Sequence, residues 1–270
     1  MDRAWAAQTG RAIGFTGPPG VGKSSLVSAL LAVLRRRGLS VAVLAVDPSS
    51  RRSGGALLGD RARIAADPAD PGVFIRSIAA RDQLGGLAEL AMPVTVLFRA
   101  LFDIVLIETV GVGQSETEIA DLADLVVFCA QPGSGDSLQF MKAGVVEIPD
   151  LAVVCKADMG DMARRSVADL KGALALSVRA SPTPPVLLIS ARDMTGIDDL
   201  ADALTTPVET GPSRRARQAR HWISTSLRIK FGREGLAAIG PQPPLASADS
   251  PFAVERSLAS RLRARLHGTD

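Results

Sequence analysis

The sequence is poor in cysteine, histidine and aromatic residues: among 270 residues there are two cysteines, two histidines, two tryptophans and no tyrosine. Cys129 and Cys155 are too few for a disulfide framework, which suits a reducing compartment. His221 and His267 both lie near the C-terminus, and no cysteine or histidine has a close neighbour of either kind. A metal site built on Cys and His ligands is therefore disfavoured.

Long hydrophobic runs are also missing. No uninterrupted apolar stretch approaches the roughly 20 residues that a membrane-spanning helix needs, and residues 1–11 lack the apolar core of a signal peptide. The hydrophobic content of 47% is ample for a buried core, and 270 residues accommodate one large domain with an appendage. We therefore expect a soluble, cytoplasmic protein without membrane contact.

The net charge of +3 is distributed unevenly along the chain. Residues 1–205 carry 20 Lys and Arg against 23 Asp and Glu, whereas residues 206–270 carry 11 against 5. A basic tail is compatible with nucleic-acid binding. Its arginines alternate with apolar residues at helical spacing, however, and no aromatic stacking platform is evident. We therefore favour a solvated or partner-facing helix.

Apolar runs of strand length alternate with helical patterns through residue 205. The expected strands lie at 12–16, 41–46, 73–77, 103–108, 125–130, 151–155 and 186–189. The expected helices lie at about 25–37, 57–64, 84–101, 114–123, 136–147, 161–179 and 196–205, with Pro93 kinking or restarting the third. This alternation predicts an α/β fold, a mostly parallel sheet with helices on both faces.

The pattern changes after Pro207, where no further strand is expected. Two amphipathic helical stripes follow, separated by the breaker sequence at 240–244. Because neither stripe belongs to the sheet, each must bury its apolar face against the body of this chain or against a second copy. We therefore divide the chain into a domain at 1–206 and a helical C-terminal arm at 207–270.

Residues 17–24 fit the phosphate-loop pattern G-x-x-x-x-G-K-[ST], between an apolar strand and an amphipathic helix. Glycines let the main chain wrap closely around phosphates, so that successive N–H groups and the helix N-terminus face the anion. Lys23 supplies a positive charge to the outer phosphates, and the Ser24 hydroxyl is placed to bind Mg²⁺. The pattern predicts a nucleoside triphosphate site formed by Gly17, Pro18, Pro19, Gly20, Val21, Gly22, Lys23, Ser24 and Ser25.

Acidic residues at strand ends are the candidates for the metal site. Glu108 closes a buried strand downstream of the phosphate loop, where it can reach the Mg²⁺ shell directly or through water. Gly111, three residues on, can offer its N–H to the γ-phosphate, which would make this loop a sensor of hydrolysis. Asp47, at the end of its own strand, is a candidate metal ligand, whereas Asp60 taken alone fits a solvated surface acid.

Cys155, Lys156 and Asp158 follow a strand at the place where guanine-binding proteins carry the motif N-K-x-D. An aspartate there accepts from two N–H groups of guanine, a pairing that adenine does not offer, and the lysine stem lies over the base. A cysteine thiol is a weak donor and cannot replace the amide of asparagine. The turn after the next strand can present a main-chain N–H to the guanine O6; it consists of Ser190, Ala191 and Arg192. A guanine nucleotide is therefore favoured, and ATP stays open.

Several segments together resemble the MeaB/ArgK/MMAA family of P-loop GTPases. They are VLAVDPSS at 43–50, GGALLGD at 54–60, ETVGVGQSE at 108–116, PGSGD at 132–136 and the basic stretch RRARQ at 214–218. The resemblance implies a P-loop G domain at 1–206 that hydrolyses GTP to GDP and phosphate. It also implies a chaperone of a cobalamin-dependent acyl-CoA mutase, such as methylmalonyl-CoA mutase, which gates adenosylcobalamin loading and protects the enzyme.

The family resemblance also assigns roles to particular residues. It implies switch segments at 47–63, 109–118 and 132–143 and homodimerisation through the arm. Two departures stand out: the chain begins about a dozen residues before its first strand, where family members usually carry a longer helical extension, and Cys155 replaces an asparagine. The residues that would surround Mg²⁺ are Ser24, Asp47, Asp60 and Glu108.

Catalysis would then rest on Lys23 and Glu108, with Gln114 and Lys142 as the best internal candidates for orienting water or stabilising charge. Both of the latter are also compatible with solvated loop residues. No arginine finger is evident in the motif loops, so we expect slow intrinsic hydrolysis that a docked mutase accelerates.

Three other functions remain open from the sequence. A nickel-insertion GTPase of the same superfamily would rely on Cys and His ligands, which this chain lacks in close spacing. An ATP-dependent kinase or transport-associated NTPase would need a substrate-binding segment, and none is recognisable. A nucleic-acid-dependent NTPase is favoured only by the charge of the tail.

Overall fold

The computed structural model describes residues 1–48, 64–80, 88–109, 118–133, 148–175, 183–206, 212–240, 243–246 and 249–266. The helices expected at 57–64 and 136–147 lie essentially outside these ranges. Of the helix expected at 114–123, residues 114–117 lie outside them, and the described part contains a single turn of 3₁₀ helix, η1 (Ile119–Asp121).

The described residues form one seven-stranded sheet in which every pair of neighbours is parallel. The order is β3-β2-β4-β1-β5-β6-β7. The strands coincide with the seven apolar runs of the sequence, so the predicted α/β class is confirmed. Their bounds are β1 Arg11–Thr16, β2 Val41–Pro48, β3 Val73–Ala80, β4 Ile104–Thr109, β5 Leu125–Ala130, β6 Leu151–Val154 and β7 Val186–Leu188.

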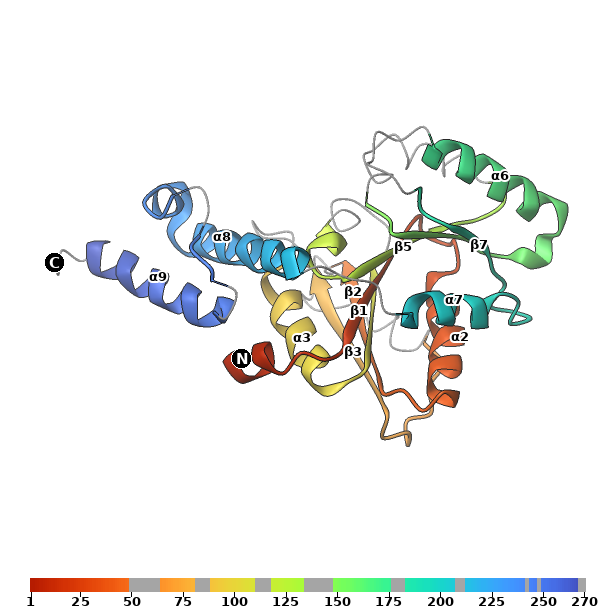
Figure 1. Ribbon diagram of the computed structural model, residues 1–270, viewed down its shortest axis with the longest axis horizontal. Coiled ribbons are helices and arrows are strands. Elements are labelled where there is room, and N and C mark those ends of the chain that lie inside the picture. Colours follow the sequence, from red (N-terminus) through yellow and green to blue (C-terminus); the bar gives the residue numbers. More distant parts are fainter. Residues whose placement is uncertain are drawn as a thin grey trace.

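Helices cover both faces of the sheet, as the continuous apolar strands require. Alternate residues of β1 show this: Ile13 and Phe15 pack with α2 (Lys23–Arg36) and α7 (Ile197–Thr205), whereas Ala12 packs on the opposite face. That face is covered by α3 (Ala88–Leu101) and α8 (Pro212–Ala237), and, toward β6 and β7, by α6 (Asp161–Ala175) (Figure 1).

Pro93 lies inside α3, which runs as one helix from Ala88 to Leu101. The sequence predicts a kink or a restart at this proline, because the ring removes one main-chain donor. The helix continues instead, with Ala91, Met92 and Val96 buried on the sheet around the proline. Tertiary packing therefore outweighs the local loss of one hydrogen bond.

The C-terminal arm packs on the body of its own chain. Ala219, Trp222, Ile223 and Leu227 of α8 are buried in the same cluster as the sheet residues of that face. A left-handed glycine, Gly232, breaks α8 near its end, and α9 (Pro251–Leu266) returns along it (Figure 1). The short N-terminal helix α1 (Asp2–Ala6) is tied to α9 by the ion pair Asp2–Arg256 and by the hydroxyl of Ser250, which donates to Asp2.

A buried carboxylate fastens the arm to the sheet. Asp124, with no exposed side-chain area, accepts two hydrogen bonds from the guanidinium of Arg215 at 2.8 and 3.0 Å and one from the main-chain N–H of Ala12 at 2.9 Å. Arg99 of α3 lies 3.2 Å away and is itself buried. Gln218 of α8 adds two hydrogen bonds to carbonyls of the turn 118–124, which leads from η1 into β5.

The charges of this network hold one another in the ionised state. Burial raises the pKa of Asp124, but Arg99 and Arg215 outweigh burial and bring the pKa below its ordinary value. Burial also lowers the pKa of Arg99 to about 10, against the attraction of Asp124. The network therefore contributes stability at neutral pH, and this contribution is lost as acid protonates Asp124 below its ordinary pKa.

Removing Asp124 is expected to destabilise the fold strongly. Asp124→Ala leaves Arg99 buried without its carboxylate, which costs about 3–5 kcal/mol of unfolding free energy. Urea unfolding at pH 7 followed by circular dichroism measures the loss. Asp161→Ala is the matched control, because it removes the exposed Asp161–Arg164 pair, which is worth less than about 1 kcal/mol. Equal losses for the two variants would contradict the assigned role.

Candidate functional site

The strand register brings the predicted site together at one edge of the sheet. Phe15 of β1 lies opposite Glu108 of β4 and opposite Val127 of β5. Because all three strands run in parallel, the loops that follow them emerge at the same edge. Residues that are far apart in the sequence therefore surround the phosphate loop.

The phosphate loop joins β1 to α2, with Lys23 as the first helical residue. Gly17 has φ +137°, and a Cβ atom there would overlap the main-chain oxygen of Cys129 in β5. Gly22 has φ +107° and forms the left-handed cap from which α2 starts. These two positions require glycine, the first for close approach and the second for backbone conformation. The main-chain N–H groups at the start of α2 are thereby placed to bind an anion.

Lys23 is held inside the loop. Its side chain is 5% exposed, and its ammonium donates to the carbonyl oxygens of Gly17 at 2.7 Å and Pro18 at 2.9 Å. The positive charge therefore lies within the loop that the sequence predicts to bind phosphates. An anion bound there would meet an ammonium group that is already desolvated and oriented.

Ser24 and Glu108 meet across the loop, as the sequence predicts for a magnesium site. The Ser24 hydroxyl donates to Glu108 Oε1 at 2.6 Å, and the Glu108 side chain is buried. A hydroxyl and a carboxylate oxygen are the hard ligands that Mg²⁺ prefers, so this donor pair fits that ion. Asp47 is the last residue but one of β2, with its main chain beside β3, and of this residue only the main chain is described. Within the described ranges, no cluster of three or more His, Cys, Asp or Glu side chains could hold a metal.

A cavity of about 270 Å³ adjoins the phosphate loop on the side of β6 and β7. Lys156, in the left-handed conformation with φ 59°, crosses its rim and donates to the carbonyl oxygen of Gly20 at 3.2 Å and to the side chain of Gln131. The lysine therefore links the cavity to the phosphate loop, and its place over a base stays a prediction. The lining is formed by Val21, Gly22, Ser25, Leu26, Cys155, Lys156, Asp158, Ile189, Ser190, Ala191 and Arg192.

Asp158 and the turn after β7 lie side by side in the wall of this cavity. The Ser190 hydroxyl donates to Asp158 Oδ1 at 3.1 Å, and Arg192, which is 86% exposed, lies 3.8 Å from Oδ2. The Ala157 N–H donates to the Ile189 carbonyl at 3.0 Å and so fixes one loop against the other. The carboxylate is thereby positioned at the cavity wall, where it can accept hydrogen bonds from a planar base.

The remaining site predictions have different outcomes. Cys155 lines the cavity and is 5% exposed. Gln131, which binds Lys156, was not predicted, because a single glutamine after a strand carries no recognisable pattern. Asp60, Gly111, Gln114 and Lys142 lie outside the described residues, so their predicted roles stay predictions.

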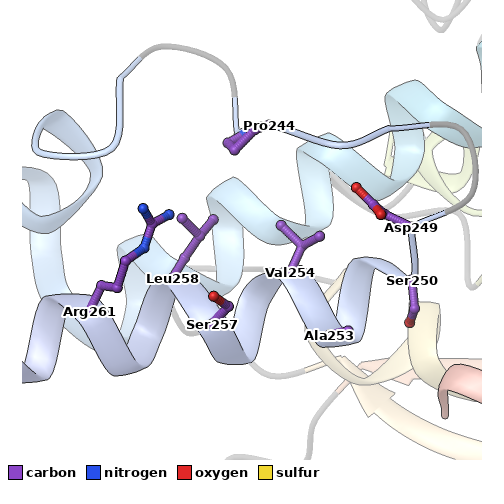
Figure 2. A pocket seen from close by; sticks show the side chains of 8 residues that line it. All are labelled: Pro244, Asp249, Ser250, Ala253, Val254, Ser257, Leu258 and Arg261. Carbon is purple, nitrogen blue, oxygen red and sulfur yellow. The ribbon is translucent and has the colours of Figure 1, made fainter.

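A second cavity, of about 360 Å³, lies on the arm away from the phosphate loop. Figure 2 shows Val254, Leu258 and Arg261 of α9 on one side and Pro244 on the other. Its lining has serine hydroxyls and one charge of each sign, from Asp249 and Arg261. Nothing in this lining resembles a phosphate or base site, so the phosphate-loop region remains the candidate active site.

Within the described part of the chain, no helix has the length and apolar character to cross a membrane.

Comparison with known proteins decides the family. Residues 1–230 match the family described as methylmalonyl Co-A mutase-associated GTPase MeaB. The chain belongs to the MeaB family of P-loop GTPases. It is 40% identical over 221 residues to a mouse protein named methylmalonic aciduria type A homolog, mitochondrial, covering 78% of this chain and 53% of that protein. It is 38% identical over 222 residues to the GTPase ArgK of Escherichia coli, covering 78% and 67%.

Solved structures with the same fold include two that cover most of the chain. A LAO/AO transport system kinase superposes with a TM-score of 0.62 at 27% identity, covering 97% of this chain and 85% of that one. The HypB protein of Helicobacter pylori, solved with nickel, superposes with a TM-score of 0.57 at 18% identity, covering 81% and 93%, and so shares the fold alone. This MeaB-family chain spans about half to two thirds of the length of the curated relatives it matches.

The cavity predicts a preference for guanine over adenine. GDP is expected to bind more tightly than ADP by about 2 kcal/mol or more, because only guanine offers Asp158 two N–H donors. Titration calorimetry with both nucleotides measures the difference. Asp158→Ala should abolish the preference, and Cys155→Asn should widen it. Asp199→Ala, on the exposed face of α7, is the control that should leave it unchanged; equal affinities of wild type for GDP and ADP would refute the base assignment.

Proposed function

We propose that this chain is a Mg²⁺-dependent GTPase that serves as a chaperone of a cobalamin-dependent acyl-CoA mutase. The observation that carries the nucleotide part is the geometry at the sheet edge, where the phosphate loop with Lys23 and Ser24 adjoins the cavity that Asp158 lines. The mutase part is supported by the family description and by the name of the mouse relative. The chaperone would gate adenosylcobalamin loading and protect the mutase.

Lys23 would bind the outer phosphates. Its ammonium now donates to the Gly17 and Pro18 carbonyls, and a triphosphate would take over these donors. Binding then exchanges one set of oxygen acceptors for another within a buried group. Because no loose side chain has to be ordered, little conformational entropy is lost.

Ser24 would hold Mg²⁺ through its hydroxyl oxygen, and Glu108 would reach the ion directly or through water. A bound Mg²⁺ supplies charge neutralisation at the phosphate oxygens during transfer. Glu108 accepts from the Ser24 hydroxyl at 2.6 Å and so fixes its orientation, the role that outer carboxylates have around metal ligands. Asp47, at the end of β2, and Asp60 are the further ligands we propose.

Hydrolysis would be slow without a partner. Gln114 and Lys142 are our candidates for orienting water and stabilising charge, and Gly111 for sensing the γ-phosphate. If a docked mutase fixes Lys142 beside the phosphates, the rate rises, because phosphoryl transfer depends on placed charges. Since linkage between two binding equilibria is reciprocal, the nucleotide would in turn set the affinity of the mutase complex.

A homodimer formed through the arm and a cytoplasmic location complete the proposal.

The basic stretch at 214–218 lies at the start of α8, where Arg214 binds Asp150 and Arg215 binds Asp124 of the same chain. These arginines are therefore used within the fold, which weakens nucleic-acid binding as an explanation of the basic tail.

A nickel-insertion GTPase finds no support beyond the shared fold. The likeness to HypB is at 18% identity, and the described residues contain no cluster of metal-binding side chains. Cys129 and Cys155 are both buried and have no histidine beside them in the sequence. A kinase or transport-associated NTPase is supported only by the name of one structural relative, the LAO/AO transport system kinase.

The coupling is tested by single-turnover GTP hydrolysis with and without a cognate mutase. The wild-type rate is expected to rise on complex formation, and Lys142→Ala should lose about 10²-fold of the stimulated rate if the lysine stabilises charge. Lys171→Ala, exposed on α6, is the matched control with an unchanged rate. A complex that forms and leaves the wild-type rate unchanged would contradict activation. Equal stimulation of Lys142→Ala would instead remove only this lysine from the mechanism.

A further inference from the structure

Two free cysteines lie in contact beneath the nucleotide site. β5 and β6 are neighbours, with Cys129 opposite Val153, so that Cys155 lies two residues farther along the same face. Each thiol is the largest influence on the pKa of the other. Both belong to the buried cluster under the phosphate loop, and the main chain of Cys129 packs directly against Gly17.

Of these two cysteines, one lines the base cavity. Cys155 lines it and is 5% exposed, whereas Cys129 is fully buried and does not contribute to the lining. Of the two cysteines, a small reagent that enters the cavity therefore meets Cys155 first. A base that fills the cavity would cover the same residue.

The surroundings of the two thiols shift their pKa values in opposite directions. The hydrogen bond with Cys129 lowers the pKa of Cys155 against the effect of burial, and Lys156 and Lys23 lower it further. The same hydrogen bond, burial and the charge of Glu108 raise the pKa of Cys129 well above its ordinary value. Cys155, which lies beside Lys156 and lines the cavity, is thus the sulfur with more thiolate character and hence the better nucleophile.

We propose that Cys155 is a peroxide-sensitive gate of the base cavity, a role that rests on the proposed binding of a guanine nucleotide there. The Cys155 thiolate attacks one oxygen of a hydroperoxide, an S–O bond forms, the O–O bond breaks, and the leaving alkoxide or hydroxide takes a proton from water. The sulfur is oxidised to sulfenic acid and the peroxide is reduced to an alcohol or water. The added oxygen occupies space at the cavity wall that a base would need.

The reaction stops at Cys155, because the strands hold the two cysteines too far apart for a disulfide. Neighbouring strands lie about 4.8 Å apart and two residues span about 6.6 Å along a strand. The resulting separation of about 8 Å between the Cα atoms exceeds the roughly 7 Å that a disulfide tolerates. The Cys155 N–H still donates to the Ala130 carbonyl at 2.8 Å, so the ladder that sets this spacing continues to Cys155. Thiols reduce a sulfenic acid, so the modification is reversible.

Two consequences distinguish a gate from incidental oxidation. A bound nucleotide covers Cys155 and protects it from peroxide. Conversely, oxidised Cys155 places a polar oxygen where the base would pack, so nucleotide affinity falls. Protection of Cys155 by the nucleotide and loss of nucleotide affinity on oxidation have the same cause, because the base and the added oxygen compete for one cavity.

The test is oxidation of the full chain with hydrogen peroxide, trapping of sulfenic acid with dimedone, and peptide mass spectrometry. We expect one adduct, on Cys155, that is suppressed by GDP and absent in Cys155→Ser. GDP affinity should fall by about tenfold or more on oxidation and recover with dithiothreitol. Cys129→Ser keeps a hydroxyl donor and should still react. Cys129→Ala removes the donor, so it should react several-fold more slowly at pH 7, and its pH–rate profile should shift upward.

Four results would overturn the gate: no adduct in the nucleotide-free protein, an adduct on Cys129, a Cys129–Cys155 disulfide, or unchanged oxidation when GDP is bound. Calorimetry on the reduced protein separates this failure from failure of the proposed function. Wild type that binds GDP yet shows any of these results contradicts the gate alone. Wild type that binds no nucleotide contradicts the guanine site, whichever way Cys155 reacts.

Discussion

The parallel register of β1 between β4 and β5 is the constraint on which the site depends. Phe15 lies opposite both Glu108 and Val127, so the loops after three strands emerge at one edge. In the sheet, β2 lies on one side of β1, beyond β4, and β5 lies on the other side. Ligands of such sheets bind outside the strand ends where the strand order reverses. The contact of Ser24 with Glu108 and the position of the base cavity are consequences of that register.

Much of this arrangement could be predicted from the sequence, because its causes are local. The seven strands are continuous apolar runs, as expected of strands that are buried on both faces. The phosphate loop has a fixed spacing of glycines, and Gly17 and Gly22 have the close contact and positive φ that explain two of them. Asp158 and Ser190 could be placed together because each follows a parallel strand, and parallel strands end at the same edge.

Long-range contacts could not be predicted. Asp124 precedes β5 as one acid among many, and only the fold brings Arg99 and Arg215 to it. The apolar stripe of α8 was recognisable, but whether it packs on its own sheet or on a second chain depends on tertiary geometry. Pro93 shows a local rule outweighed by burial of its neighbours. The contact between Cys129 and Cys155 requires the pairing of β5 with β6, and no sequence motif joins these two cysteines.

The central claim is that one guanine nucleotide with Mg²⁺ spans the phosphate loop and the cavity beside β6 and β7. A crystal structure with Mg²⁺ and a non-hydrolysable GTP analogue tests it most directly. The account predicts the base against Asp158 and the Lys156 stem, the phosphates around Lys23, and the metal on the Ser24 oxygen. A base bound outside this cavity, or a metal bound without Ser24, would contradict it.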